Sequence, residues 1–143
     1  MNKAGAVLGI VVAVLVALGA AWLWGASGRW EAQRALGMSE LQNDLLDARS
    51  AVLDARLAIY SVNFGEASRH LEDARGLLRR ADERLKGLGR QEDAKQLEPA
   101  ITQIDEAQRL AGRLDQDANS RAGDAAKTLS DVLASLAPAA ARK

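Results

Sequence analysis

The sequence predicts an all-α protein in which one N-terminal transmembrane helix is followed by an antiparallel bundle of three to four helices. Three observations support this fold class. An uncharged apolar run extends from Ala4 to Trp24. The chain after Arg29 repeats apolar side chains at alternating spacings of three and four residues, as amphipathic helices do. No stretch shows the alternation of β-branched residues that is typical of strands.

The run from Ala4 to Trp24 predicts a membrane anchor, because a helix of this length spans roughly 32 Å, about the thickness of the bilayer hydrocarbon. Its far end carries every tryptophan of the chain, in the position that indole rings prefer at a membrane interface: Trp22, Trp24 and Trp30. A cleavable secretory signal is the alternative, since Lys3 supplies a basic start and Ala17 with Gly19 resembles a cleavage site. The apolar run continues past that site, which favours the anchor.

Small residues recur every four positions along the anchor. They are Gly5, Gly9, Ala13, Ala17, Ala21 and Gly25. Such a strip lets two helices approach closely in lipid, so we expect it to pack against a second copy or another transmembrane protein. The alternative is a chance pattern, because glycine and alanine are frequent throughout this segment.

The orientation of the anchor in the membrane is predicted from the few basic residues near its two ends. Lys3 precedes the span, and Arg29 and Arg34 follow it. We favour a short basic tail inside the cell and a bundle on the periplasmic side of a bacterial inner membrane.

Composition excludes several classes of function. Nineteen basic and nineteen acidic residues cancel, so the broad positive field of a nucleic-acid binder is absent. The chain has no cysteine, which excludes thiol nucleophiles and thiolate metal sites. His70 is the only histidine, so the paired glutamate–histidine motifs of a di-iron bundle cannot be formed within one chain. We therefore expect neither an enzyme nor a bound cofactor or metal.

The first helix of the bundle is expected to begin at Ser39, which forms a capping-box pattern with Gln42. Its main apolar seam is Leu41, Leu45, Ala48, Val52, Ala55, Ile59 and Val62. Four further residues widen this seam: Leu46, Leu53, Leu57 and Tyr60. A stripe of this width indicates burial against more than one neighbour.

A second helix is expected from Glu66 to Gly87 or Gly89, since glycine suits a helix C-terminus. Its seam is Ala67, Leu71, Ala74, Leu78, Ala81, Leu85 and Leu88. The two helices would form a hairpin through the break at residues 63–65.

The centre of this hairpin reads Tyr60-Ser61-Val62-Asn63-Phe64-Gly65-Glu66-Ala67, followed by Leu71 and Ala74. With Phe64 as the turn aromatic and Ala67 and Ala74 as the small residues, the hairpin within residues 51–81 resembles a tetratricopeptide-type helical repeat. Ala55 stands where the family has glycine, and no second copy follows after 34 residues. The resemblance therefore implies only the hairpin geometry.

A third helix carries the seam Leu97, Ile101, Ile104, Ala107, Ala111 and Leu114, and Pro99 either opens it or kinks a helix that began near Gln91. A break at residues 117–120, with Ser120 as cap, leads to a fourth helix with the seam Ala122, Ala125, Leu129, Val132 and Leu136. One long rod instead of two helices is the alternative. The expected divisions are an anchor (1–28), a juxtamembrane linker (29–38), a bundle (39–137) and a frayed tail (138–143). The linker either extends the anchor helix or bends at Gly37.

A basic tract in the second helix is a candidate contact for anionic lipid or an acidic partner: Arg75, Arg79, Arg80 and Arg84. The alternative is a solvated face, because acidic residues are interleaved and can form one-turn pairs. His70 is expected to be an ordinary polar residue at the edge of the hairpin seam. The alternative is that it forms a pH-sensitive contact.

These observations favour a non-catalytic, single-pass membrane protein that acts as an accessory or scaffolding subunit of a larger assembly. Its partners would be membrane lipid, a transmembrane helix and a protein that binds the bundle. The alternatives are an extracytoplasmic ligand-sensing bundle and a secreted lipid-binding protein.

Overall fold

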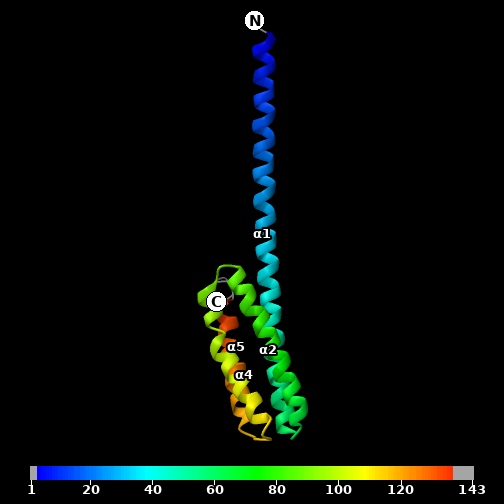
Figure 1. Ribbon diagram of the computed structural model, residues 1–143, viewed down its shortest axis with the longest axis vertical. Helices are drawn as coiled ribbons and strands as arrows, with labels where there is room; N and C mark the ends of the chain where they lie inside the picture. The colour runs from blue at the N-terminus through cyan, green and yellow to red at the C-terminus, as the bar shows by residue number, and fades with distance from the viewer. Residues whose placement is uncertain (1–2, 137–143) are drawn as a thin grey trace. The chain divides into compact units, whose positions relative to one another are not determined.

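The computed structural model describes the backbone of residues 3–136 and the side chains of residues 32–136. The helices are α1 (Lys3–Tyr60), α2 (Phe64–Gly87), α3 (Gln91–Lys95), α4 (Glu98–Ala111) and α5 (Ala118–Leu136), as Figure 1 shows. No strand is present between residues 3 and 136. The predicted all-α fold class is therefore confirmed.

Two compact units make up the chain, Met1–Gly37 and Met38–Lys143. Within the first unit, the small-residue strip and the three tryptophans of the predicted anchor lie outside the described side chains. A search of the described residues finds no helix that is both long and apolar enough to cross a membrane.

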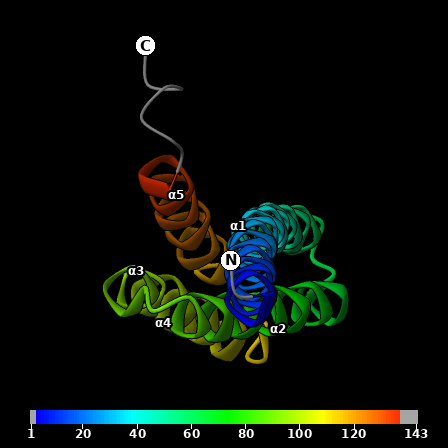
Figure 2. The ribbon, with the colours of Figure 1, turned by 90° about the horizontal axis from the view of Figure 1, so that it is seen from above.

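The second unit is a helical bundle, as predicted. The chain direction reverses from the last part of α1 to α2, and again from α4 to α5 (Figure 1). Helix α2 packs against α3 and α4, and α4 packs against α5. Arg56 of α1 donates a hydrogen bond from Nε to Asn119 Oδ1 of α5 at 2.9 Å. Figure 2 shows the helices of this unit from above, side by side. Because α4 and α5 are separate helices, the long-rod alternative is wrong.

The core follows the predicted seams closely. The described side chains contain no buried polar or charged residue. The largest fully buried side chains are Leu41, Leu45, Val52, Ile59, Leu71, Leu78, Leu85, Leu97, Ile104 and Leu129. Alanines at the intervening turns, such as Ala74 and Ala107, are fully buried as well, so the helices can approach closely.

The expected helix start at Ser39 is wrong, because α1 continues without interruption through Gly37 and Ser39. A single glycine within a helix costs only about 1 kcal/mol relative to alanine, which does not outweigh the hydrogen bonds of a continuous helix. The juxtamembrane segment 29–38 is helical and extends α1, which is one of the two forms that the sequence left open for it. Ser120, like Ser39, is not a cap, since it lies inside α5.

Two residues of the main predicted seams are exposed instead. Val62 and Leu114 lie in the turns after α1 and α4, with positive φ angles of 59° and 60°. The turn rotates each side chain away from the seam that its spacing predicted, so 66% of Val62 and 70% of Leu114 is exposed.

The connection before α4 combines both interpretations of Pro99. The short helix α3 begins at Gln91, and α4 begins separately at Glu98 with Pro99 in its first turn. Proline suits this position because its nitrogen needs no hydrogen-bond partner there.

Candidate interaction surface

Three of the four basic residues predicted to contact an anion form ion pairs within the bundle. Arg75 Nε lies 2.9 Å from Asp105 Oδ1 of α4. Arg80 Nη2 lies 3.6 Å from Asp44 Oδ1, and Arg84 donates from Nε to Asp44 Oδ2 at 2.9 Å. The fourth, Arg79, is exposed and forms no ion pair with the described residues.

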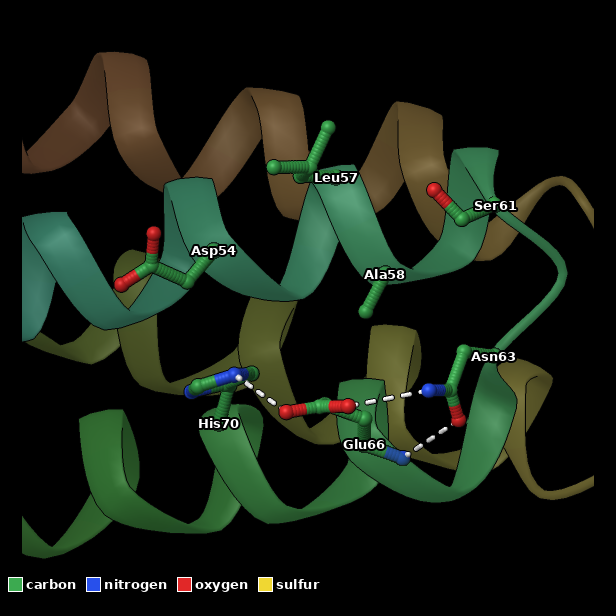
Figure 3. A pocket seen from close by; sticks show the side chains of 7 residues that line it. All are labelled: Asp54, Leu57, Ala58, Ser61, Asn63, Glu66 and His70. Atoms are coloured by element: carbon green, nitrogen blue, oxygen red, sulfur yellow. Dashed lines mark hydrogen bonds and ion pairs between the residues drawn. The ribbon is translucent and has the colours of Figure 1, made fainter.

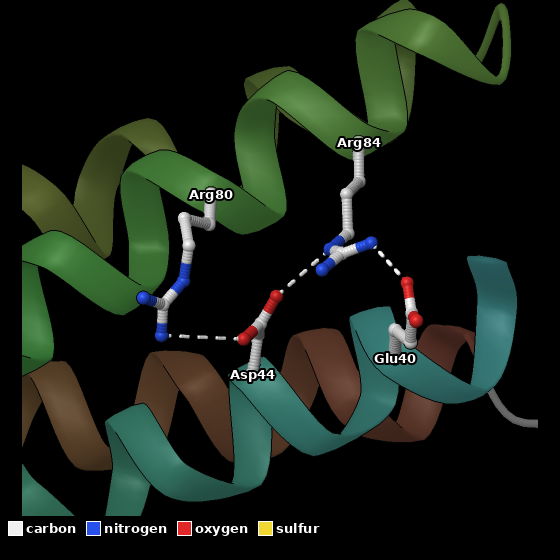
Figure 4. A network of polar contacts seen from close by, with 4 residues as sticks. All are labelled: Glu40, Asp44, Arg80 and Arg84. Carbon is white, nitrogen blue, oxygen red and sulfur yellow. Dashed lines mark hydrogen bonds and ion pairs between the residues drawn. The ribbon is translucent and has the colours of Figure 1, made fainter.

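Asp44 joins α1 to α2 by forming ion pairs with both arginines, and Arg84 also contacts Glu40 (Figure 4). The Asp44 side chain is only 13% exposed, whereas the guanidinium groups reach solvent. The hydrogen bond to Asp44, aided by the charge of Glu40, raises the pKa of Arg84. This network explains much of the basic tract as a structural link between two helices.

A pocket of about 420 Å³ lies where α1 and α2 approach their connecting turn (Figure 3). Its polar groups mostly serve the start of α2. Asn63 Oδ1 accepts from the backbone nitrogen of Glu66 at 3.3 Å, and Asn63 Nδ2 donates to Glu66 Oε2 at 2.9 Å. His70 Nε2 lies 3.7 Å from Glu66 Oε1. Since capping uses Asn63 and Glu66, the pocket is explained by local structure.

His70 therefore lies at the edge of the hairpin, as predicted, with its side chain 32% exposed. No group of three or more histidine, aspartate or glutamate residues within the described chain is arranged to hold a metal ion.

One side of α1 carries large apolar side chains that the bundle does not cover. They are Leu46, Leu53, Leu57 and Tyr60, and we call them the outer face of α1. Leu57 is 66% exposed and Tyr60 is 79% exposed. The sequence predicted that these residues widen the buried seam, and this prediction is wrong for the described chain. The wide stripe predicted that these side chains pack against a second neighbour of α1, and no described residue supplies that neighbour.

The two exposed turn residues have unusual backbone conformations. Val62 follows α1, and the backbone nitrogen of the next residue, Asn63, donates to the Ala58 oxygen at 2.8 Å. Leu114 follows α4 in the same way, and the backbone nitrogen of Asp115 donates to the Leu110 oxygen at 3.1 Å. Both turns are Schellman motifs, which normally place glycine at this left-handed position.

The turn after α2 has the same hydrogen bonds and the usual residue. Gly89 has a φ of 74°, and the Arg90 nitrogen donates to the Leu85 oxygen at 2.8 Å. Left-handed backbone costs a non-glycine residue roughly 1–2 kcal/mol, and a β-branched residue such as Val62 is a clear outlier. Figure 1 places the turn between α1 and α2 and the turn between α4 and α5 at the same end of the bundle. We call Val62 and Leu114 the turn pair.

Comparisons with models of known protein families, with characterised proteins and with solved structures find no match. The sequence signal for the outer face of α1 was the excess of leucines in the first helix. The signal for the turn pair was an apolar residue beside the turn that follows α1 and beside the turn that follows α4. The strain of the turn pair has no signal in the spacing of the residues.

Proposed function

We propose that this protein is a non-catalytic, membrane-anchored helical bundle that binds protein as an accessory or scaffolding subunit of a larger assembly. The apolar run from Ala4 to Trp24 supports the anchor, because its length and lack of charge suit a bilayer. In this proposal the bundle lies on the periplasmic side of a bacterial inner membrane.

The observation that carries the proposal is the turn pair. Val62 and Leu114 expose aliphatic side chains to solvent on strained backbone, although glycine would relieve the strain in both turns. Residues kept in sparsely populated conformations gather at functional sites. An apolar side chain held outward at this cost is suited to contact with another protein.

The charge pairing supports binding through apolar contact rather than through a charged patch. Arg75, Arg80 and Arg84 are already neutralised by carboxylates of neighbouring helices. The pocket beside the turn between α1 and α2 does not favour a ligand sensor, because four of its seven lining residues are exposed and two of the seven, Asn63 and Glu66, cap a helix.

The test is purification of the full chain from its native membranes in mild detergent. We expect the wild-type chain to emerge with a companion protein in fixed stoichiometry. The double variant Val62→Gly/Leu114→Gly should lose that companion and yet melt at a higher temperature, because glycine removes the strain.

A matched control replaces exposed residues that lie away from the turns, in the variant Asp73→Ala/Arg79→Ala. This control should keep the companion. If the wild-type chain has no companion, or if the glycine variant retains it in full, the proposal is wrong.

A further inference from the structure

The outer face of α1 has the spacing of a coiled-coil seam. Leu46, Leu53 and Tyr60 are seven residues apart, and Leu57 follows Leu53 by four. In a heptad, the first three therefore occupy position d, and Leu57 occupies position a. The other a positions of this seam are Asn43 and Ser50, both exposed.

Charged residues flank this seam with a different sign on each side. The same heptad places Asp47 and Asp54 at position e, and Arg49 and Arg56 at position g. In a coiled coil, the e and g positions lie beside the apolar seam and face the partner helix.

The charges nearest the middle of the seam have no ion-pair partner among residues 32–136. Arg49, Asp47 and Asp54 form no ion pair with the described residues. These three side chains can therefore pair with charges of a partner helix across the seam.

From these observations we propose that the outer face of α1 binds the same face of a second copy of this chain, with the two α1 helices parallel. In a parallel pair, each g residue faces the e residue five positions later on the other helix. Arg49 of each copy then meets Asp54 of the other. An antiparallel pair would bring like charges together, arginine against arginine and aspartate against aspartate.

This inference is independent of the proposed function. It concerns the outer face of α1, whereas the turn pair carries the proposal of a companion protein. Loss of a companion in the glycine variant would leave self-association intact, and loss of self-association would leave the turn pair intact.

Disulfide crosslinking tests the arrangement directly, because the chain contains no cysteine that would interfere. Single variants Asn43→Cys and Ser50→Cys are made in the full chain and oxidised in mild detergent. Equivalent residues of a parallel seam lie close enough for a disulfide, whose Cα atoms are about 4.4–6.8 Å apart. Both variants should form crosslinked dimers, and Asp73→Cys, on the exposed side of α2, should not.

Charge exchange then tests the pairing of Arg49 with Asp54. Added to Ser50→Cys, the substitution Asp54→Arg should lower the crosslinked fraction several-fold, because it opposes two arginines. The matched control Asp73→Arg should leave the fraction unchanged. Exchange of both charges, Arg49→Asp/Asp54→Arg, should restore it.

The proposal is wrong if neither Asn43→Cys nor Ser50→Cys crosslinks above the level of Asp73→Cys. Crosslinking of only one of them would indicate an antiparallel or staggered contact and would also contradict it. Should the double exchange fail to fold, an equal loss of crosslinking in Asp54→Arg and Asp73→Arg would still overturn the proposed pairing.

Discussion

Helix α1 presents two apolar faces of similar composition to different surroundings. Leu45, Val52 and Ile59 are fully buried against the other helices of the bundle. The outer face carries Leu53, Leu57 and Tyr60, which are exposed and are not covered by the other described helices. Periodicity therefore identifies an apolar face of a helix, but it does not say whether the partner of that face belongs to the same chain.

The largest effect expected from this comparison concerns two adjacent leucines. Leu45 is 0% exposed and Leu46 is 44% exposed. Leu45→Ala should lower the free energy of unfolding by about 2–5 kcal/mol, because it leaves a cavity in a packed core. Leu46→Ala should change it by less than about 0.5 kcal/mol under conditions in which copies are dissociated. Urea denaturation of the full chain in detergent, followed by circular dichroism, measures both.

Similar losses in the two variants would contradict the distinction between the faces. A large loss in Leu46→Ala alone would mean that the outer face packs within the bundle.

The second effect concerns the turns that end the helices. Val62→Gly and Leu114→Gly should each raise the free energy of unfolding by about 1 kcal/mol, because glycine adopts the left-handed backbone without strain. Gly89→Ala should lower it by a similar amount, about 1 kcal/mol. An added Cβ at Gly89 meets no atom within 4 Å, so only backbone strain enters the comparison.

Thermal melting of the three variants beside the wild type checks this prediction. Destabilisation by glycine in both turns would show that the two side chains contribute more to the bundle than their exposure indicates.

Much of the fold could be predicted from the sequence, because burial in a bundle follows the helical period. Leu71, Leu78 and Leu85 are buried as their spacing predicted, and α2 ends at Gly87 as expected. The same rule failed for Val62 and Leu114, because a turn changes the direction of the chain and ends the period. The predicted helix start at Ser39 was wrong for another reason, because a capping pattern does not stop a helix that can continue.

The candidate surface was less predictable, because it depends on contacts between helices. One-turn pairs such as Lys86 with Asp82 follow from the sequence, and Lys86 Nζ lies 2.6 Å from Asp82 Oδ2. The pairing of Arg84 with Asp44 depends on how α1 and α2 are aligned. That alignment also decides which leucines of α1 are left exposed.

The smallest expected effect is the pH dependence of one surface pair on α4, away from both faces of α1. Arg109 donates from Nε to Glu106 Oε2 at 2.8 Å, and this hydrogen bond lowers the pKa of Glu106 below its ordinary value of 4.5. A carboxyl group with a lowered pKa stabilises the folded state above its unfolded pKa, and this contribution is lost as the pH falls through the folded value.

The melting temperature of wild type should therefore slightly exceed that of Glu106→Gln at pH 7, and the difference should shrink and disappear as the pH falls through the lowered pKa of Glu106. Glu92→Gln, beside the exposed Lys95, is the matched control for a looser pair. A difference that grows as the pH falls would contradict the assigned direction of the pKa change.

The most direct test of the central claim, that the outer face of α1 is covered by protein, is the alkylation rate of a single cysteine at residue 57. In Leu57→Cys, the rate is compared between native membranes and the dissociated chain in strong detergent, with Asp73→Cys as the reference. We expect alkylation at residue 57 to be several-fold slower in membranes and alkylation at residue 73 to be unchanged. Equal rates at residue 57 in both states would contradict it.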